Sequence, residues 1–377
     1  MQRVVSPPRP GWQRKVESKG LIFHTTDEGR TYWDESAYYR FTRYEVDQIE
    51  KATYALNDLC LQAIDHILTH NLFADFDVPP QYVEWLRRSW NEDEHTIYGR
   101  FDLLYDGQHP PKLAEFNADT PTALLEAGVI QWFWLQDLHP EEDQFNSIHE
   151  RLIEAWQRYA EQVEEGEVVY FTSLEDHPED VMTVNYLRDT AIQAGLRTEY
   201  IAIESVGWQP QRRQFIDGRQ RPIRHIFKLY PWEWMYHEEY GPHLLESTTK
   251  WLEPPWKVLL SNKALLPLLH EMYPDHPNLL SASWEPLPNC YIRKPIQGRE
   301  GANIAVIDQG REIVATEGEY AEQPVIYQEF FPTPRFDGRT IVIGSWIVNG
   351  YACGIGIRED ESIITNNTSR FVPHLFG

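Results

Sequence analysis

The stretch 97–122 reads IYGRFDLLYDGQHPPKLAEFNADTPT, and its pattern decides the fold of the surrounding chain. Polar and apolar residues alternate over 97–106 and again over 112–119, as they do in half-buried strands. Asp106-Gly107 and Pro110-Pro111 lie between the two runs and favour a turn. We therefore predict a β-hairpin here, followed by a helix with Thr120 or Thr122 as its N-cap.

One face of this hairpin carries polar residues that suit a metal ion. Residues two apart on a strand share a face, so Arg100 lies beside Asp102, and Glu115 lies beside Asn117. If the strands pair, two carboxylates, an amide oxygen and a guanidinium meet. Such oxygens suit Mg²⁺, and the guanidinium suits a phosphate or a developing anion. A solvated strand face with salt bridges would show the same pattern, so both interpretations stay open.

The composition limits the class of protein. The chain has 377 residues, 42 % of them hydrophobic and 13 % aromatic, which excludes disorder for most of it and predicts two or three compact units. The net charge of −24 argues against nucleic acid and anionic membranes as partners. No apolar run is long enough for a membrane span or a signal peptide, and three cysteines are too few for a disulfide framework. We expect a cytoplasmic protein, of an oligomeric state that the sequence does not indicate.

Helical and strand patterns alternate outward from the hairpin, which is typical of an α/β protein. Residues 168–206 read as strand, helix and strand, a βαβ unit. The other predicted elements are an extended arm over 1–20, a helix over 36–70, a hairpin over 213–229 that turns at Asp217-Gly218, helix over 232–255, a strand-like start that runs into a helix over 257–274, and strands over the last hundred residues.

A second polar feature is the glycine-containing run Lys294–Asn303, KPIQGREGAN, between two predicted strands. Its backbone N–H groups could bind phosphates with help from Lys294, although the residues alone favour a surface hairpin. It matches neither a P-loop nor a dinucleotide-binding turn. Three further candidates have structural alternatives: Lys263 as a solvated charge, Gln328 as a residue at an interface or a nucleotide's edge, and Arg358 as an ion-pair partner near a turn.

These motifs together resemble a known family. RFD…EFNADTPT, SNKALLP, RKPIQGREGANI, YQEFF and GIGIREDESIIT are similar, in this order, to the synthetase domain of glutathionylspermidine synthase. The resemblance runs from about Gly20 to the C-terminus and is closest to stand-alone bacterial members described as acid–amine ligases. We expect no counterpart of the amidase domain that some members carry.

The resemblance implies an α/β (α+β) fold of the circularly permuted ATP-grasp type with a βαβ pre-ATP-grasp domain. Residues 1–165 would then contribute N-terminal helices and the metal-binding strands of the ATP-grasp core. Residues 166–245 would form the pre-ATP-grasp domain, and residues 246–377 would form the nucleotide-binding and lid region.

The resemblance also implies roles for individual residues. Asp102, Glu115 and Asn117 would hold Mg²⁺, as two ions, while Arg100 would stabilise the transition state and Arg358 the acyl-phosphate. ATP, as co-substrate, would be bound by Arg100, Phe101, Asp102, Lys263, Lys294, Gly301, Gln328, Ile363, Ile364 and Thr365. On the substrate side, Thr120 and Thr122 replace family serines, and Glu179-Asp180 replaces a pair of glutamates. Those departures put glutathione plus spermidine in doubt as the particular substrates.

The implied activity is that of an ATP-dependent carboxylate–amine ligase. An acyl-phosphate would form from a small acid or peptide and react with an amine, giving an amide, ADP and phosphate. Two alternatives remain at this level. One is an ATPase or regulatory ATP-grasp protein that binds MgATP without ligation. The other is a carbohydrate-active hydrolase with paired carboxylates.

Overall fold

The computed structural model describes residues 1–26, 29–365 and 369–377. One five-stranded antiparallel sheet joins segments that are far apart in the sequence, in the order β18-β17-β16-β3-β4. The predicted hairpin is present, because Asp102 pairs with Glu115 and Arg100 with Asn117 across its two strands. The strands are β3 (Tyr98–Leu104), β4 (Lys112–Asn117), β16 (Thr340–Val348), β17 (Tyr351–Asp360) and β18 (Arg370–Val372).

A second antiparallel sheet has the order β11-β15-β12-β13-β14. Its strands are β11 (Ala282–Ser283), β12 (Cys290–Pro295), β13 (Ala305–Asp308), β14 (Arg311–Ala315) and β15 (Val325–Glu329). The predicted glycine loop connects β12 to β13, so it lies between two paired strands as the sequence indicated.

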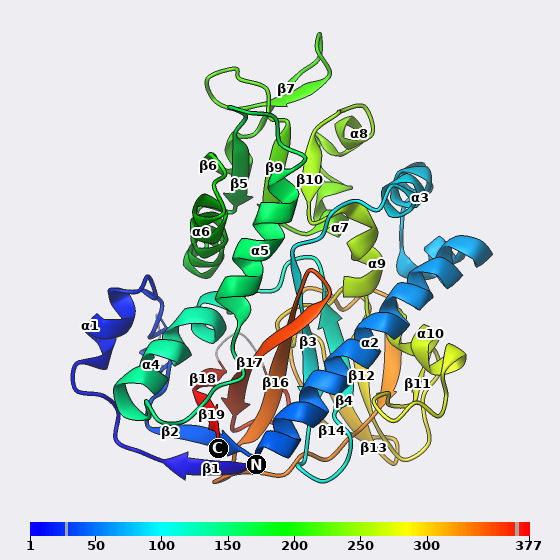
Figure 1. Ribbon diagram of the computed structural model, residues 1–377. Helices are drawn as coiled ribbons and strands as arrows, with labels where there is room; N and C mark the ends of the chain where they lie inside the picture. Colours follow the sequence, from blue (N-terminus) through cyan, green and yellow to red (C-terminus); the bar gives the residue numbers. More distant parts are fainter. Residues whose placement is uncertain (27–28, 366–368) are drawn as a thin grey trace.

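A parallel sheet of four strands, β10-β9-β5-β6, contains the predicted βαβ unit. Its strands are β5 (Val169–Ser173), β6 (Thr198–Ala202), β9 (His225–Leu229) and β10 (Lys250–Leu252). Helix α6 (Pro178–Gln193) connects β5 to β6, and α5 (Ile148–Ala160) packs against α6. In Figure 1 this unit stands above the two antiparallel sheets.

The longest helix, α2 (Arg43–His70), packs against β16 and β17 and crosses their sheet in Figure 1. Thr42 and Glu45 begin it with reciprocal side-chain-to-backbone hydrogen bonds, a capping box. The other helices are α1 (Trp12–Glu17), α3 (Val83–Asn91), α4 (Gln131–Leu138), α7 (Trp232–Met235), α8 (Gly241–Leu244), α9 (Val258–Ser261) and α10 (Leu265–Met272). A π-helix (Glu126–Ile130) precedes α4, and short 3₁₀ turns cover Leu72–Phe76, Pro80–Tyr82, Ile203–Ser205 and Pro255–Lys257.

Several local predictions were wrong, mainly where strands find distant partners. The arm over 1–20 contains β1 (Gln2–Val5) and α1, and β1 pairs with β2 (Ala37–Phe41). Because β2 also pairs with β19 (His374–Phe376), helix α2 begins at Arg43 and not near 36.

The predicted hairpin over 213–229 is also wrong, although its turn at Asp217 exists. Strand β8 (Gln214–Ile216) pairs with β7 (Gly207–Gln209), whereas β9 enters the parallel sheet. The strand-like start at 257 is the helix α9. In the described structure, the stretch 232–255 that was predicted to be helical contains the short helices α7 and α8, then β10 and the start of a 3₁₀ turn at Pro255.

The parallel sheet contributes side chains to two hydrophobic clusters, one on each of its faces. Tyr170 and Ile226 point into a cluster that includes α2 and the β3–β16 sheet. Phe171 and Phe227, their neighbours along the strands, point into a second cluster with α5 and α6. Because successive side chains of β5 and β9 enter different clusters, the βαβ unit packs against the rest of the molecule through the first of them. Among the described residues, no helix has the length and apolar character needed to cross a membrane.

Candidate active site

A cavity of about 260 Å³ lies between the β3–β4 hairpin, the N-terminus of α6, the glycine loop and residues 363–365. Most of the residues singled out in the sequence line it, although they come from both ends of the chain. These are Arg100, Asp102, Glu115, Asn117, Thr120, Thr122, Glu179, Asp180, Lys263, Lys294, Gly301, Arg358, Ile363, Ile364 and Thr365.

Asp102 lies between two guanidinium groups. Its Oδ1 accepts a hydrogen bond from Arg100 Nε at 2.7 Å, and its Oδ2 pairs with Arg358 from β17. Arg100 and Asp102 belong to β3 and Arg358 to β17, and β16 pairs with both of these strands in one sheet, so backbone pairing fixes their relative positions. The salt bridges that were the alternative interpretation of this strand face are therefore present, and the face is part of the cavity.

Glu115 lies opposite Asp102 and faces two ammonium groups. Lys263 Nζ is 3.1 Å from its Oε2, and Asn117 Nδ2 donates to its Oε1 at 3.3 Å. Burial raises the pKa of Glu115, but the charges of Lys263 and Lys294 outweigh it and hold that pKa well below its usual range. The carboxylate is thus ionised and available to a cation.

Lys263 and Lys294 are buried, and hydrogen bonds to neighbouring groups fix the positions of their ammonium groups. Lys263 Nζ donates to the carbonyl of Gly298 at 2.6 Å, which connects it to the glycine loop. Lys294 Nζ donates to Ala114 O at 3.0 Å and to Gln328 Oε1 at 2.7 Å. Burial, opposed by Glu115, lowers the pKa of Lys294 to about 8. The alternative of a solvated Lys263 does not hold, because the side chain is 8 % exposed.

Two predicted residues have their side chains elsewhere in the described structure. Phe101 stacks on Phe116 in the core, with ring centroids 3.8 Å apart, on the opposite face of β3 from Asp102. Gln328 is buried behind Lys294, and its Nε2 donates to Leu113 O at 2.9 Å. Gln328 holds Lys294 in place, and it is not among the described residues that line the cavity.

The glycine loop packs closely against the segment 363–365. Gly301 has a φ of +73°, and a Cβ at this position would collide with the carbonyl oxygen of Thr365. From the same loop, Arg299 Nη1 donates to Thr120 Oγ1 at 2.8 Å, and its other terminal nitrogen pairs with Glu233. Within the described residues, Arg299 Nε and Glu233 Oε2 are buried without a hydrogen-bond partner. Such groups suit a polar ligand.

The end of the cavity at α6 is acidic. Burial, and then the charge of Glu179, raise the pKa of Asp180 to about 7. Burial also raises the pKa of Glu179, although a hydrogen bond with Thr122 opposes this. Glu300 of the glycine loop adds a further carboxylate to the lining. A cation bound here would relieve the repulsion among these groups.

The donor set at Asp102 and Glu115 fits Mg²⁺. Two carboxylates and the Asn117 amide come from paired positions of one hairpin, and oxygens of this kind, completed by phosphate and water, are the usual ligands. No group of three or more His, Cys, Asp or Glu side chains suited to a metal occurs in the described part of the chain. A divalent ion would therefore need Asn117 and oxygens from a bound molecule.

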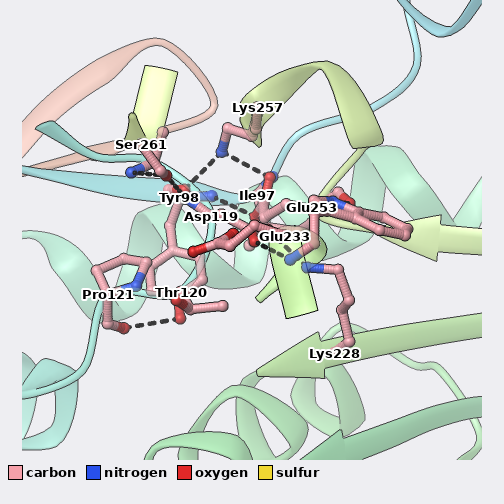
Figure 2. A network of polar contacts seen from close by, with 12 residues as sticks. Ile97, Tyr98, Asp119, Thr120, Pro121, Lys228, Glu233, Glu253, Lys257 and Ser261 are labelled. Carbon is pink, nitrogen blue, oxygen red and sulfur yellow. Dashed lines mark hydrogen bonds and ion pairs between the residues drawn. The ribbon is translucent and has the colours of Figure 1, made fainter. Parts of the chain in front are cut away.

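Sequence reasoning missed a set of buried residues behind the cavity, shown in Figure 2. Asp119 pairs with Lys228, and Glu253 pairs with Lys257. Asp119 ends the EFNAD motif, and Lys228 is the one charged residue within the apolar run IFKL. A lone charge inside such a run signals a buried partner, which the sequence alone does not identify.

Comparison with models of known protein families shows which family this chain belongs to. The family described as "Glutathionylspermidine synthase preATP-grasp" matches residues 3–377. The chain belongs to the glutathionylspermidine synthase family. The resemblance that the motifs predicted is thereby confirmed.

Three curated proteins are similar to this chain over most of its length. The Haemophilus influenzae protein "Putative acid–amine ligase" is 38 % identical over 392 residues and covers 100 % of both chains. A trypanothione synthetase from Crithidia fasciculata is 30 % identical, covering 84 % of this chain and 53 % of its own length. The bifunctional glutathionylspermidine synthetase/amidase of Escherichia coli is 29 % identical, covering 89 % and 58 %. The chain thus spans all of the first relative and about half of the other two.

A solved structure confirms the predicted fold class. A glutathione synthetase-like effector from Globodera pallida matches with a TM-score of 0.63 over 99 % of this chain and 100 % of that chain, at 10 % identity. The chain has the ATP-grasp α/β fold, in which the β3–β4 hairpin precedes the sheet of β11 to β15 along the sequence.

Proposed function

We propose that this family member is an ATP-dependent carboxylate–amine ligase that forms an amide through an acyl-phosphate. One observation carries the proposal: Asp102, Glu115 and Asn117 share a single cavity with Lys263, Lys294 and the glycine loop. Family membership and the names of the relatives support it. The proposal extends to a cytoplasmic enzyme with small-molecule partners, and to the domain division at residues 165 and 245.

The protein's contribution to phosphoryl transfer would be positioning and charge. The ammonium groups of Lys263 and Lys294 would bind ATP phosphates, and Arg100 and Arg358 would stabilise charge on the transferred group. Mg²⁺, held by Asp102, Glu115 and Asn117, would neutralise phosphate charge. The glycine loop, which already contacts the segment 363–365, would exclude water from the acyl-phosphate.

The two substrates would bind at opposite sides of the phosphate region. The acid would lie against Thr120, Thr122 and Arg299 Nε, which has no hydrogen-bond partner among the described residues and suits a carboxylate. The amine would enter at Glu179 and Asp180, two neighbouring carboxylates whose mutual repulsion an ammonium group would relieve. The chemistry supports a peptide-like acid and a cationic amine.

The test is ADP release with Mg²⁺ and a panel of acids and amines that includes glutathione, short peptides and polyamines. Asp102→Asn and Glu115→Gln should each reduce the rate by at least about 100-fold, because they remove charge that stabilises the transition state. Glu92→Gln, at an exposed carboxylate, is the matched control and should keep wild-type turnover. Unchanged rates in the two site variants would contradict the metal assignment.

Product analysis separates the remaining alternatives. A ligase gives an amide that mass spectrometry detects, together with one ADP for each amide. ADP without amide across the whole panel would favour the ATPase or regulatory alternative. Absence of thermal stabilisation by MgATP or MgADP would favour the hydrolase alternative, because a hydrolase of this kind needs no nucleotide.

A further inference from the structure

Residues 118–122, the β4 loop, connect the metal-binding strand β4 to the helical region that follows. The loop carries Thr120 and Thr122, which line the cavity. Among the described residues its backbone pairs with no strand, and Ser261 Oγ accepts hydrogen bonds from Ala118 N at 3.1 Å and Asp119 N at 2.8 Å. The position of the two threonines therefore depends on side-chain contacts.

The first of these contacts is a direct buried ion pair. Asp119 Oδ1 is 2.6 Å from Lys228 Nζ, and both side chains are 0 % exposed. Asp119 Oδ2 accepts from the backbone N–H of Trp232 at 3.1 Å, and Lys228 Nζ lies 4.3 Å from the centre of the Trp232 ring. Because Lys228 belongs to β9, the loop is attached to the parallel sheet of the βαβ unit.

A second buried ion pair reaches the same loop through Tyr98, as Figure 2 shows. Glu253 and Lys257 pair at 2.6 Å. Glu253 accepts from Tyr98 N at 3.0 Å, and Lys257 donates to Tyr98 O at 2.7 Å. With its backbone held in this way, Tyr98 donates from its hydroxyl to Pro121 O at 2.9 Å.

Stability alone does not account for two such pairs. Replacement of a buried ion pair by apolar residues of similar size is often neutral or stabilising, because desolvation offsets much of the attraction. A buried pair does fix the relative positions of the two segments that carry it, since each charge must lie within hydrogen-bond distance of its partner. The two pairs converge on five residues that include two cavity-lining threonines.

We propose that Asp119 and Lys228 are a positioning pair that sets the β4 loop for binding the acid substrate. The inference rests on the proposed function, and it assigns the pair no contact with the reacting atoms. The pair lies behind the cavity wall in the described structure. It acts through Thr120 and Thr122, so its loss should weaken acid binding and leave nucleotide binding unchanged.

The experiment compares Asp119→Asn, Lys228→Met and the double variant with wild type, using glutathione or the panel acid of highest turnover. Each single variant should raise the acid KM about tenfold, change kcat less than about threefold and leave the MgADP Kd unchanged. The single variants should also unfold at lower temperature, because each leaves a buried partner unpaired. In the double variant, Tm should recover while the acid KM stays high. A purely structural pair would restore both together.

Two further variants keep the test decisive. Glu35→Gln removes another buried carboxylate, paired with Arg9, and should lower Tm without changing the acid KM. Tyr98→Phe removes only the hydroxyl that holds Pro121 O, so it serves if the charge variants do not fold, and it should raise the acid KM severalfold. An acid KM within about twofold of wild type in all folded variants would overturn the positioning pair alone. A wild-type protein that makes no amide would overturn the proposed function and the pair with it.

Discussion

Asp180 is the cavity residue whose ionisation should be easiest to follow, because its pKa is raised to about 7. The folded protein therefore holds a proton that the unfolded chain loses near pH 4, and folding stability falls as the pH rises to about 7. Asp180→Asn removes this loss. We expect its gain in Tm over wild type to grow between about pH 4 and pH 7 and to be constant above.

Differential scanning fluorimetry over this pH range measures the gain. Asp189→Asn, at an exposed position of the same helix, is the control and should show no such trend. A gain in Asp180→Asn that is independent of pH would contradict the raised pKa. The same variant should raise the KM of a cationic amine, since it removes a countercharge.

Lys294 gives a second pH-dependent prediction, and its pKa is shifted downward whereas that of Asp180 is shifted upward. Burial lowers its pKa to about 8, so the free protein loses this positive charge as the pH rises from 7 to 9. If the ammonium group binds phosphates, the MgADP Kd should increase about tenfold over this range, in proportion to the lost protonated fraction. Lys294→Met should bind more weakly at every pH and show a much flatter profile. Isothermal titration calorimetry provides the values, and a flat wild-type profile would remove Lys294 from the phosphate site.

At the scale of elements, the glycine loop between β12 and β13 and the turn between β13 and β14 each contain a glycine, Gly301 and Gly310, that can be compared. Gly301 and Gly310 both have positive φ, so alanine costs about 1 kcal/mol of strain at either position. Only at Gly301 would the new Cβ collide with a neighbour, the carbonyl oxygen of Thr365, whereas Gly310 faces open space. We expect Gly301→Ala to weaken MgADP binding at least about tenfold, and Gly310→Ala to leave it unchanged. Equal Kd values in the two variants would show that the loop does not close the nucleotide site.

Local signals were sufficient to predict some elements and insufficient for others. The hairpin β3–β4 was predictable because alternation and turn residues lie in one short stretch, and its register brought Asp102 opposite Glu115. The pairing of β8 with β7, and of β9 with β5, depends on strands outside the local stretch, so alternation over 213–229 indicated the wrong partner. For the same reason, the partner of Lys228 could not be predicted, since Asp119 is 109 residues away.

At the scale of the whole molecule, the sheets share one core and should unfold together. The β3–β16 sheet contains strands from both ends of the chain, and Ile343 on β16 belongs to the same hydrophobic cluster as Ile226 on β9. Both side chains are 0 % exposed, so Ile→Val at either position removes one buried methyl group and should cost about 1 kcal/mol. Because the cluster is continuous, we expect one thermal unfolding transition for the whole molecule, and each variant should lower its Tm.

Calorimetry of Ile343→Val and Ile226→Val tests this cooperativity, with the calorimetric and van't Hoff enthalpies compared in each case. Equal enthalpies and similar decreases in Tm would mean that the βαβ unit and the ATP-grasp sheets form one folding unit. Two transitions, of which each variant moves a different one, would mean that the two parts unfold separately. If MgADP binds between the β3–β4 hairpin and the glycine loop, as proposed, it should raise the Tm of a single unit as a whole. In a molecule with two units, it should raise only the transition that Ile343→Val lowers.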